Sequence, residues 1–575
     1  MGCDLSGKRA INQTKKIELT SEIDNSLKCI RLEWERRTGM RLSLNGLENQ
    51  EFWHSRQFAL PEFSIKEMRE KTERHPAWVH IGPGNIFRSF IAHLQQKLLN
   101  QGLVDVGITA VEARDSELID IVYKAHDNLS ILVTMNPDQS CEKTVIGSIG
   151  EVLTAIPGSE DWQRLKRIFS SPDLQIVSFT VTEKGYKLKS GDGIFMPEAE
   201  KDFSACPDNS LLFPCKLASL LYVRFLGGQY PITLLSLDNC SHNGAVVEEA
   251  INEVALQWSE RGLVKKEFLT YIKEKISYPW SMIDKITPRP AENVQSLLIE
   301  NDIEDIGVIS NHGGSFFAPF VNAEKTEYLV VEDSFKNGRP PLEKVGVIFT
   351  DRETVDKVER MKVCTCLNPL HTTLAVYGCL LGYTLIADEM RDKELKRLVW
   401  SVGREGLPVV TDPGVLSPEK FMKECLEIRF PNPAIPDTPQ RIACDTSQKV
   451  GIRFGVTIRE YGMKAGELRY IPLAIAGWCR YLMGVDDEGK SFELSPDPLL
   501  LSLTERFKNI RLGETVDSRE VLKPILSDVS IFGSNLYDTG VAGKIENYFE
   551  EMIQGAGAIR DVLKKYLSSE CQNIQ

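Results

Sequence analysis

The chain has 575 residues, of which 42% are hydrophobic and 26% charged, and its formal net charge is −13. This length is sufficient for two domains with substantial cores, and the proportions are ordinary for a soluble globular protein. An acidic chain without a concentrated basic face argues against binding nucleic acid. An anionic substrate is still compatible with this balance, because a few buried Lys and Arg residues can dominate a pocket.

The first half of the chain has the pattern of a parallel α/β sheet. Residues 1–39 are polar, with charges at mixed spacing, and we expect an N-terminal extension that has no core of its own. From Trp78 onward, short apolar runs alternate with helical stretches, which is typical of a parallel sheet covered by helices. We expect strands at 78–81, 106–111, 131–134, 176–181 and 232–237, and a first helix at 89–99.

The second half is dominated by helical periodicity. We expect helices at 370–390, 394–402, 417–429, 465–482 and 545–566, and we place a boundary between 281 and 290. The predicted fold class is therefore α/β, with a parallel α/β domain at 40–288 and a mainly α-helical domain at 289–575.

Cysteine usage and hydropathy predict the compartment. The 13 cysteines are odd in number and show no framework spacing, so we expect free thiols in a reducing compartment, the cytoplasm. Cys364 and Cys366 have one residue between them, which is a poor zinc-ligand spacing, and we expect no metal. No segment approaches the roughly 18–20 apolar residues that cross a bilayer, so we expect no membrane contact.

A glycine-containing turn follows the first expected strand. Gly82 and Gly84 are placed where a dinucleotide fold lets the backbone approach a pyrophosphate, and Asn85 opens the following helix. Arg88 stands near the place of the usual third glycine. Taken alone, this pattern is equally compatible with a simple tight turn.

An acidic residue at the end of the second strand supports a dinucleotide site. Glu112 follows the strand at 106–111, at a suitable distance to bind the adenosine ribose hydroxyls. Its carboxylate would repel a 2′-phosphate, which favours NAD over NADP, although Arg114 leaves NADP as an alternative. The simpler interpretation of Glu112 is a solvated strand end.

Five further segments combine polar side chains with apolar surroundings. They are 180–186, 236–244, 281–288, 361–371 and 441–449. Together with the glycine turn, and in this order, they resemble the polyol-specific long-chain dehydrogenase/reductase family, whose members act on mannitol or on fructuronate. The similarity extends from about Leu60 to the C-terminal region.

The resemblance implies a metal-free, NAD-dependent oxidoreductase that interconverts a linear polyol or sugar acid and its 2-keto form. It also implies that residues 40–288 form a Rossmann-type dinucleotide-binding domain and that the helical domain at 289–575 serves substrate binding and catalysis. This chemistry needs an acid/base group for the hydroxyl proton and donors for the developing alkoxide, and Lys and Asn side chains can provide both. The implied residues are Lys362 as general acid/base, Asn239 and Asn368 as oxyanion donors, His371 as an orienting and substrate-binding group, and Asp284, Arg441 and Lys449 as pocket residues.

Each of these assignments has a structural alternative. Asn368 and His371 are three residues apart and share a helix face, but a histidine on an apolar helix is often only a satisfied core residue. Arg441 and Lys449 are eight apart, near enough to one face to converge on a ligand, or to form a solvated basic face.

One departure from the family pattern affects the expected base. Lys362 precedes Asn368 by six residues, where the family has five, and in an unbroken helix Lys362 and His371 would point to opposite sides. Either the backbone bulges between Val363 and Leu367, or Lys362 precedes the helix. Pro369 suggests a helix that starts at Pro369, which favours the second alternative.

Two substrate pairs are open within this family: the neutral pair mannitol and fructose, and the sugar-acid pair mannonate and fructuronate. Lys184 is associated with fructuronate-type members and Arg441 with mannitol-type members. Because a cationic side chain stabilises a carboxylate, we favour reduction of fructuronate to mannonate, with mannitol/fructose as the alternative. A non-catalytic nucleotide-binding module is the alternative of a different class, supported by the offset of Lys362.

Overall fold

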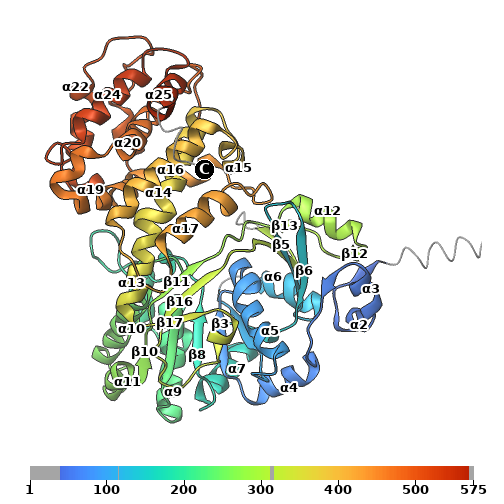
Figure 1. Ribbon diagram of the computed structural model, residues 1–575. Coiled ribbons are helices and arrows are strands. Elements are labelled where there is room, and N and C mark those ends of the chain that lie inside the picture. The colour runs from blue at the N-terminus through green and yellow to red at the C-terminus, as the bar shows by residue number, and fades with distance from the viewer. Residues whose placement is uncertain (1–38, 114–115, 311–315, 569–575) are drawn as a thin grey trace, which may run out of the picture.

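The computed structural model describes residues 39–113, 116–310 and 316–568. The predicted extension, apart from Gly39, and Arg114 lie outside the described residues. Figure 1 shows the strands gathered in one part of the molecule, while the C-terminal helices, drawn in orange and red, form a lobe beside them.

The central element is a six-stranded sheet in the order β10-β9-β8-β3-β4-β7, in which every neighbouring pair is parallel. In chain order this is 3-2-1-4-5-6, the order of a doubly wound dinucleotide fold. The α/β prediction with a Rossmann-type first domain is confirmed. The strands are β3 (Trp78–Ile81), β4 (Ile108–Glu112), β7 (Ile149–Thr154), β8 (Ile176–Phe179), β9 (Ile232–Ser236) and β10 (Ile276–Ser277).

The strand order reverses between β3 and β8. These two strands pair in parallel with Ile81 opposite Phe179, and both are buried throughout because helices cover the sheet. Ligands of such sheets bind at the carboxyl ends of the strands at this point. The main helices of this part are α4 (Ile65–Arg74), α5 (Ala92–Asn100), α7 (Glu160–Ser170), α9 (Phe213–Gly227), α10 (Asn243–Glu260) and α11 (Glu267–Lys275).

Two smaller sheets extend the strand-rich part beyond residue 288. One has the order β15-β5-β6-β2, with β15 (Phe320–Glu324), β5 (Ser130–Met135), β6 (Cys141–Ile146) and β2 (Phe58–Ala59). The other has the order β11-β16-β17, with β11 (Ser281–Asp284), β16 (Tyr328–Glu332) and β17 (Ile348–Thr350). The division at 288 stays a prediction, and these pairings favour a boundary near Asp351, where the first long C-terminal helix begins.

The C-terminal part is helical. Its longer elements are α13 (Arg352–Met361), α14 (Asn368–Leu380), α16 (Lys393–Gly406), α17 (Pro418–Glu424), α20 (Tyr470–Tyr481), α22 (Ser518–Leu526), α24 (Ala542–Met552) and α25 (Ala558–Leu567). The helix α14 is buried from Thr372 to Leu380, so it packs on all sides. Within the described ranges, no helix is both long and apolar enough to span a bilayer.

Two of the expected helices are each divided. The stretch 545–566 contains the end of α24 and most of α25, because Gly555 and Gly557 between them have positive φ angles of 153° and 83°. In the stretch 370–390 the helix α14 ends at Leu380, just before Gly382, which has φ 76°. A second, short helix follows as α15 (Ile386–Glu389). Apolar periodicity continues across both breaks, which is why it did not reveal them.

Candidate active site

The extra residue between Lys362 and Asn368 is absorbed by a π-helical turn. Lys362–Cys366 form one π turn between α13 and α14, and the Leu367 amide donates to the Lys362 carbonyl over 3.1 Å, a five-residue separation. A π turn absorbs one residue, so Lys362 and His371 lie about 80° apart around the helix instead of about 180°. The bulge is therefore the alternative that occurs.

Our preference for a pre-helical Lys362 was wrong. Lys362 directly continues α13, and α14 begins at Asn368 with Pro369 in its first turn. The first turn of a helix tolerates proline because its N–H groups have no intrahelical acceptor. Pro369 thus marks the restart of an α-helix after a π turn, not the end of a loop.

The Lys362 ammonium is buried among polar groups from two other segments. Its Nζ donates to the Ile283 carbonyl over 2.9 Å and to Oδ1 of Asn239 over 3.3 Å, and lies 3.5 Å from Oδ1 of Asp284. Asn239 follows β9 and Asp284 ends β11. The structure thus brings together three of the predicted residues, and because Asn239 accepts with its amide oxygen, its amide nitrogen is left as a donor.

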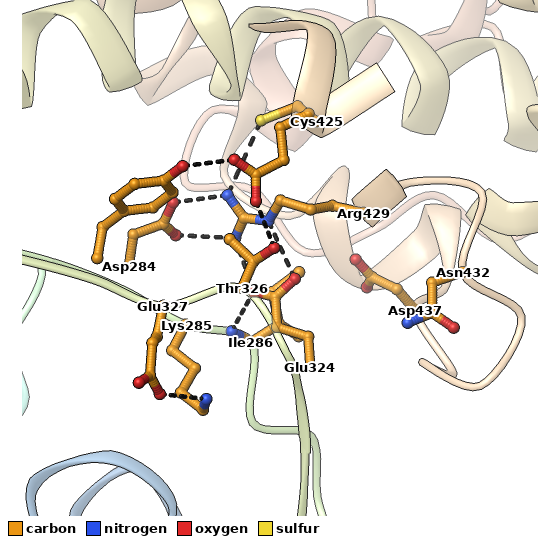
Figure 2. A network of polar contacts seen from close by, with 12 residues as sticks. Asp284, Lys285, Ile286, Glu324, Thr326, Glu327, Cys425, Arg429, Asn432 and Asp437 are labelled. Carbon is orange, nitrogen blue, oxygen red and sulfur yellow. Dashed lines mark hydrogen bonds and ion pairs between the residues drawn. The ribbon is translucent and has the colours of Figure 1, made fainter. Parts of the chain in front are cut away.

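Arg429 also binds Asp284 (Figure 2). It contacts both oxygens of Asp284, at 2.6 and 3.0 Å, and both oxygens of Glu324, at 2.8 and 3.0 Å. Burial alone would raise the pKa of Asp284, but Lys362 and Arg429 outweigh burial and lower the pKa to about 2. Asp284 is therefore an anion that holds the Lys362 ammonium in place.

His371, in the first turn of α14, belongs to a second group of polar side chains together with Asp437 and Arg441. Its Nε2 lies 2.9 Å from Oδ2 of Asp437, which is within ion-pair distance, but the angle does not meet that of a hydrogen bond. The His371 ring stacks on the Phe430 ring, with 5.0 Å between the ring centroids. Arg441 binds the other oxygen of Asp437 at 2.6 Å, with 64% of its own side chain exposed. Burial opposes ionisation of Asp437, yet His371 and Arg441 keep its pKa below the ordinary value.

Lys449 belongs to a third group. Its Nζ donates to the Cys444 carbonyl over 2.6 Å, and burial together with Arg453 lowers its pKa. Arg453 donates to Oγ1 of Thr372, the residue after His371 on α14. This contact places the third group against the helix that carries Asn368 and His371.

The glycine turn lies at the switch point of the sheet. Gly82 has φ 91°, and a Cβ there would lie 2.8 Å from the Thr180 carbonyl, so only glycine fits. A Cβ on Gly84 would meet no atom within 4 Å, which leaves open space above the turn. The Arg88 amide bonds the Gly84 carbonyl at 3.2 Å, so a helix starts directly at this turn. These features fit a dinucleotide pyrophosphate.

Asn85 and Arg88 support the turn from behind. Arg88 is fully buried and donates to Oδ1 of Asn85 over 2.9 Å and to the Ala318 carbonyl over 2.6 Å. Asn85 in turn donates to the Pro288 carbonyl over 3.2 Å. In this arrangement Arg88 positions the turn through Asn85. Glu112, the other predicted cofactor residue, is the last residue of β4 and is only partly buried.

Replacing Gly84 with Val tests the open space above the turn. We expect the KM for the cofactor to rise at least about tenfold, because a side chain there displaces a ligand that the fold itself does not need. Thermal unfolding should change little, since the position has no close neighbour and an ordinary φ. The matched control is Gly191→Val, which also has no atom within 4 Å but lies in an exposed loop; an equal effect on cofactor KM in both variants would contradict the placement.

Four residues of this region carried no predicted role. Glu324 and Arg429 are paired with residues remote in the sequence, so no local pattern indicates them. Asp437 pairs with the remote His371 and also with Arg441, four residues on, a spacing that was visible in the sequence. Arg453 follows Lys449 by four residues, one helical turn, and that spacing is the signal that was present. In the described parts of the chain, no three His, Cys, Asp or Glu residues are grouped as metal ligands.

Comparisons with known proteins match both parts of the chain. Residues 76–344 match the mannitol dehydrogenase Rossmann domain and residues 354–553 the mannitol dehydrogenase C-terminal domain. The D-mannonate oxidoreductase of Thermotoga maritima is 48% identical over 537 residues, which cover 92% of this chain and 100% of that protein. The mannitol 2-dehydrogenase of Emericella nidulans is 30% identical over 470 residues, which cover 80% and 86%.

A solved structure gives the same result at the level of the fold. The Pseudomonas fluorescens mannitol 2-dehydrogenase, solved as a ternary complex with NAD and D-mannitol, is 27% identical with a TM-score of 0.68, and the match covers 92% of this chain and 100% of that one. Both halves of the chain are included in these matches, in the same order. The chain therefore belongs to the mannitol dehydrogenase family.

Proposed function

We propose that this protein is an NAD-dependent fructuronate reductase that interconverts D-fructuronate and D-mannonate. The observation that carries the proposal is the 48% identity with a D-mannonate oxidoreductase over that protein's whole length, against 30% for the mannitol 2-dehydrogenase. The basic residues Lys449 and Arg453 beside α14 support an anionic substrate over a neutral one.

NAD is the proposed cofactor, bound at the glycine turn. The open space at Gly84, the helix that starts there and the carboxylate of Glu112 suit its pyrophosphate and adenosine ribose. The structural relative in complex with NAD supports this choice. When bound, the nicotinamide supplies the hydride that reduces the keto carbon.

Lys362 is the proposed general acid for reduction. As a C–H bond forms at the keto carbon, the carbonyl oxygen gains negative charge, and an N–H bond of the Lys362 ammonium breaks as an O–H bond forms on that oxygen. Asp284 keeps the ammonium oriented, at 3.5 Å. Lys362 then recovers a proton from solvent, and in the direction of oxidation its neutral amine takes the proton from the hydroxyl.

Asn239 and Asn368 are the proposed oxyanion donors. Asn239 already accepts from Lys362 through Oδ1, which fixes its amide so that Nδ2 is available to the substrate oxygen. Asn368 opens α14 immediately after the π turn. His371, held by Asp437, orients a substrate hydroxyl, and Arg441 acts through Asp437.

The test is oxidation of NADH followed at 340 nm with fructuronate, together with reduction of NAD by mannonate in the reverse direction. We expect turnover in both directions, unaffected by a chelator, because the proposed acid/base is Lys362 and not a metal-bound water. NADPH should be a much poorer substrate, because Glu112 repels a 2′-phosphate. Absence of turnover with fructuronate and mannonate would refute the proposal.

The cytoplasm is the proposed location. The ten cysteines between Cys141 and Cys479 that the structure describes are free thiols, as expected of a protein in a reducing compartment. That the protein does not bind nucleic acid stays a prediction from its acidic balance.

A further inference from the structure

Two cations beside the catalytic helix, Lys449 and Arg453, form no ion pair among the described residues, although Asp445 and Asp497 act on Lys449 from a greater distance. In the part of the chain that the structure describes, each has only a neutral oxygen as acceptor, the Cys444 carbonyl and the Thr372 hydroxyl. Burial lowers the pKa of Arg453 to about 10. An unpaired, largely desolvated guanidinium is costly to a fold, and an anionic ligand would offset that cost.

Arg453 binds α14 at Thr372, one helical turn after Asn368, the expected oxyanion donor. Thr372, its acceptor, is the residue after His371, and its own hydroxyl donates to the Asn368 carbonyl over 2.9 Å. Four residues of helix rise by about 6 Å. A group bound by Arg453 therefore lies about that far along α14 from a group bound by the Asn368 amide.

This separation matches the linear form of a six-carbon keto acid. In fructuronate the keto carbon and the carboxylate carbon are four C–C bonds apart, which is about 5 Å in an extended chain with bonds of about 1.5 Å. In fructose, the neutral analogue, a hydroxymethyl group takes the place of the carboxylate. A guanidinium at this distance thus meets the group that differs between the two candidate substrates.

The other cations of the region are already neutralised. Arg429 is buried between Asp284 and Glu324, and Arg441 is paired with Asp437 and mostly exposed. Lys362 is bound by Asn239 and Asp284. Among these cations, all within the described part of the chain, Arg453 and Lys449 combine a position at α14 with spare hydrogen-bond donors.

We propose that Arg453, assisted by Lys449, binds the substrate carboxylate and so makes this site selective for a sugar acid over a neutral ketose. The inference rests on the proposed function and deepens it, because it names the residue that selects the substrate class. Arg453 is a binding residue in this account, not an acid or a base, so its loss should affect KM more than kcat.

The experiment compares Arg453→Gln and Arg453→Lys with the control Arg469→Gln, an exposed arginine of the same lobe. For fructuronate we expect kcat/KM to fall about 10- to 100-fold in Arg453→Gln, the range of a lost charge-assisted hydrogen bond, mostly through KM. Arg453→Lys should be intermediate, because lysine keeps the charge but not the planar fork. The control should behave like the wild type.

A binding readout separates selectivity from damage to the fold. By isothermal titration calorimetry with NADH present, Arg453→Gln should weaken D-mannonate binding at least about tenfold and leave D-mannitol binding unchanged. Equal weakening of both ligands, or unchanged mannonate binding, would overturn the proposal; if Arg453→Gln fails to fold, the same comparison with Arg453→Lys decides. A wild type that binds mannonate but does not reduce fructuronate would refute the proposed function and leave this inference standing.

Discussion

Replacing Lys362 with Met will lower kcat for fructuronate reduction by about 10²- to 10⁴-fold, the usual contribution of a positioned general acid. Methionine keeps the length of the side chain but cannot donate the proton. The buried cluster should hold together, because Arg429 still neutralises Asp284 at 2.6 Å. The measurement is single-turnover oxidation of NADH, which isolates the chemical step from product release.

The control for this variant is on the same helix. Lys357→Met removes a partly exposed lysine of α13 that pairs with Glu353, and its kcat should equal that of the wild type. NADH binding, followed by fluorescence, should be unchanged in both variants. A Lys362→Met enzyme with more than a tenth of the wild-type kcat would exclude Lys362 as the general acid and would favour a non-catalytic role for its ammonium.

Replacing Arg429 with Leu will lower the free energy of unfolding by about 3–5 kcal/mol, the usual cost of removing one partner of a buried ion pair. The cost arises because Asp284 and Glu324, both buried, lose the same guanidinium. Burial already raises the pKa of Glu324 despite Arg429, so without Arg429 this carboxylate should be protonated. Urea unfolding of the wild type and the variant gives the difference.

A surface pair provides the comparison for Arg429. Arg352→Leu breaks an ion pair with Glu332 in which the arginine side chain is 48% exposed, and such pairs contribute only about 0–1 kcal/mol. If Arg429→Leu were no more destabilising than Arg352→Leu, the cluster in Figure 2 would not be a structural anchor of the site.

The sequence predicted four of the six strands of the central sheet, because their signals are local, and it missed β7 and β10; the strand expected at 131–134 lies in the sheet of β15, β5, β6 and β2. The strand expected at 78–81 is β3 with the same bounds, and the strands at 131–134, 176–181 and 232–237 each overlap an observed strand closely. Short apolar runs buried on both faces are easy to recognise. The glycine turn follows directly from the end of β3.

The predictions failed where structure depends on one residue or on remote partners. The extra residue before Asn368 allowed either a bulge in the helix or a Lys362 that precedes the helix. Pro369 favoured the second alternative, but the structure has a bulge, the π turn at Lys362–Cys366. Arg429 carried no predicted role, because its partners Asp284 and Glu324 are more than 100 residues away. Strands after residue 288 were underestimated because β15 and β16 pair with strands from the first half, which no local pattern shows.

The most direct test of the account is the ratio of kcat/KM for fructuronate to kcat/KM for fructose, measured on the wild-type enzyme with NADH and a chelator. Reduction of a sugar acid at a site with unpaired cations predicts a ratio of at least about 100, since each lost charge-assisted contact changes binding about 10- to 100-fold. A ratio below one would contradict the account and would make the protein a mannitol-type dehydrogenase.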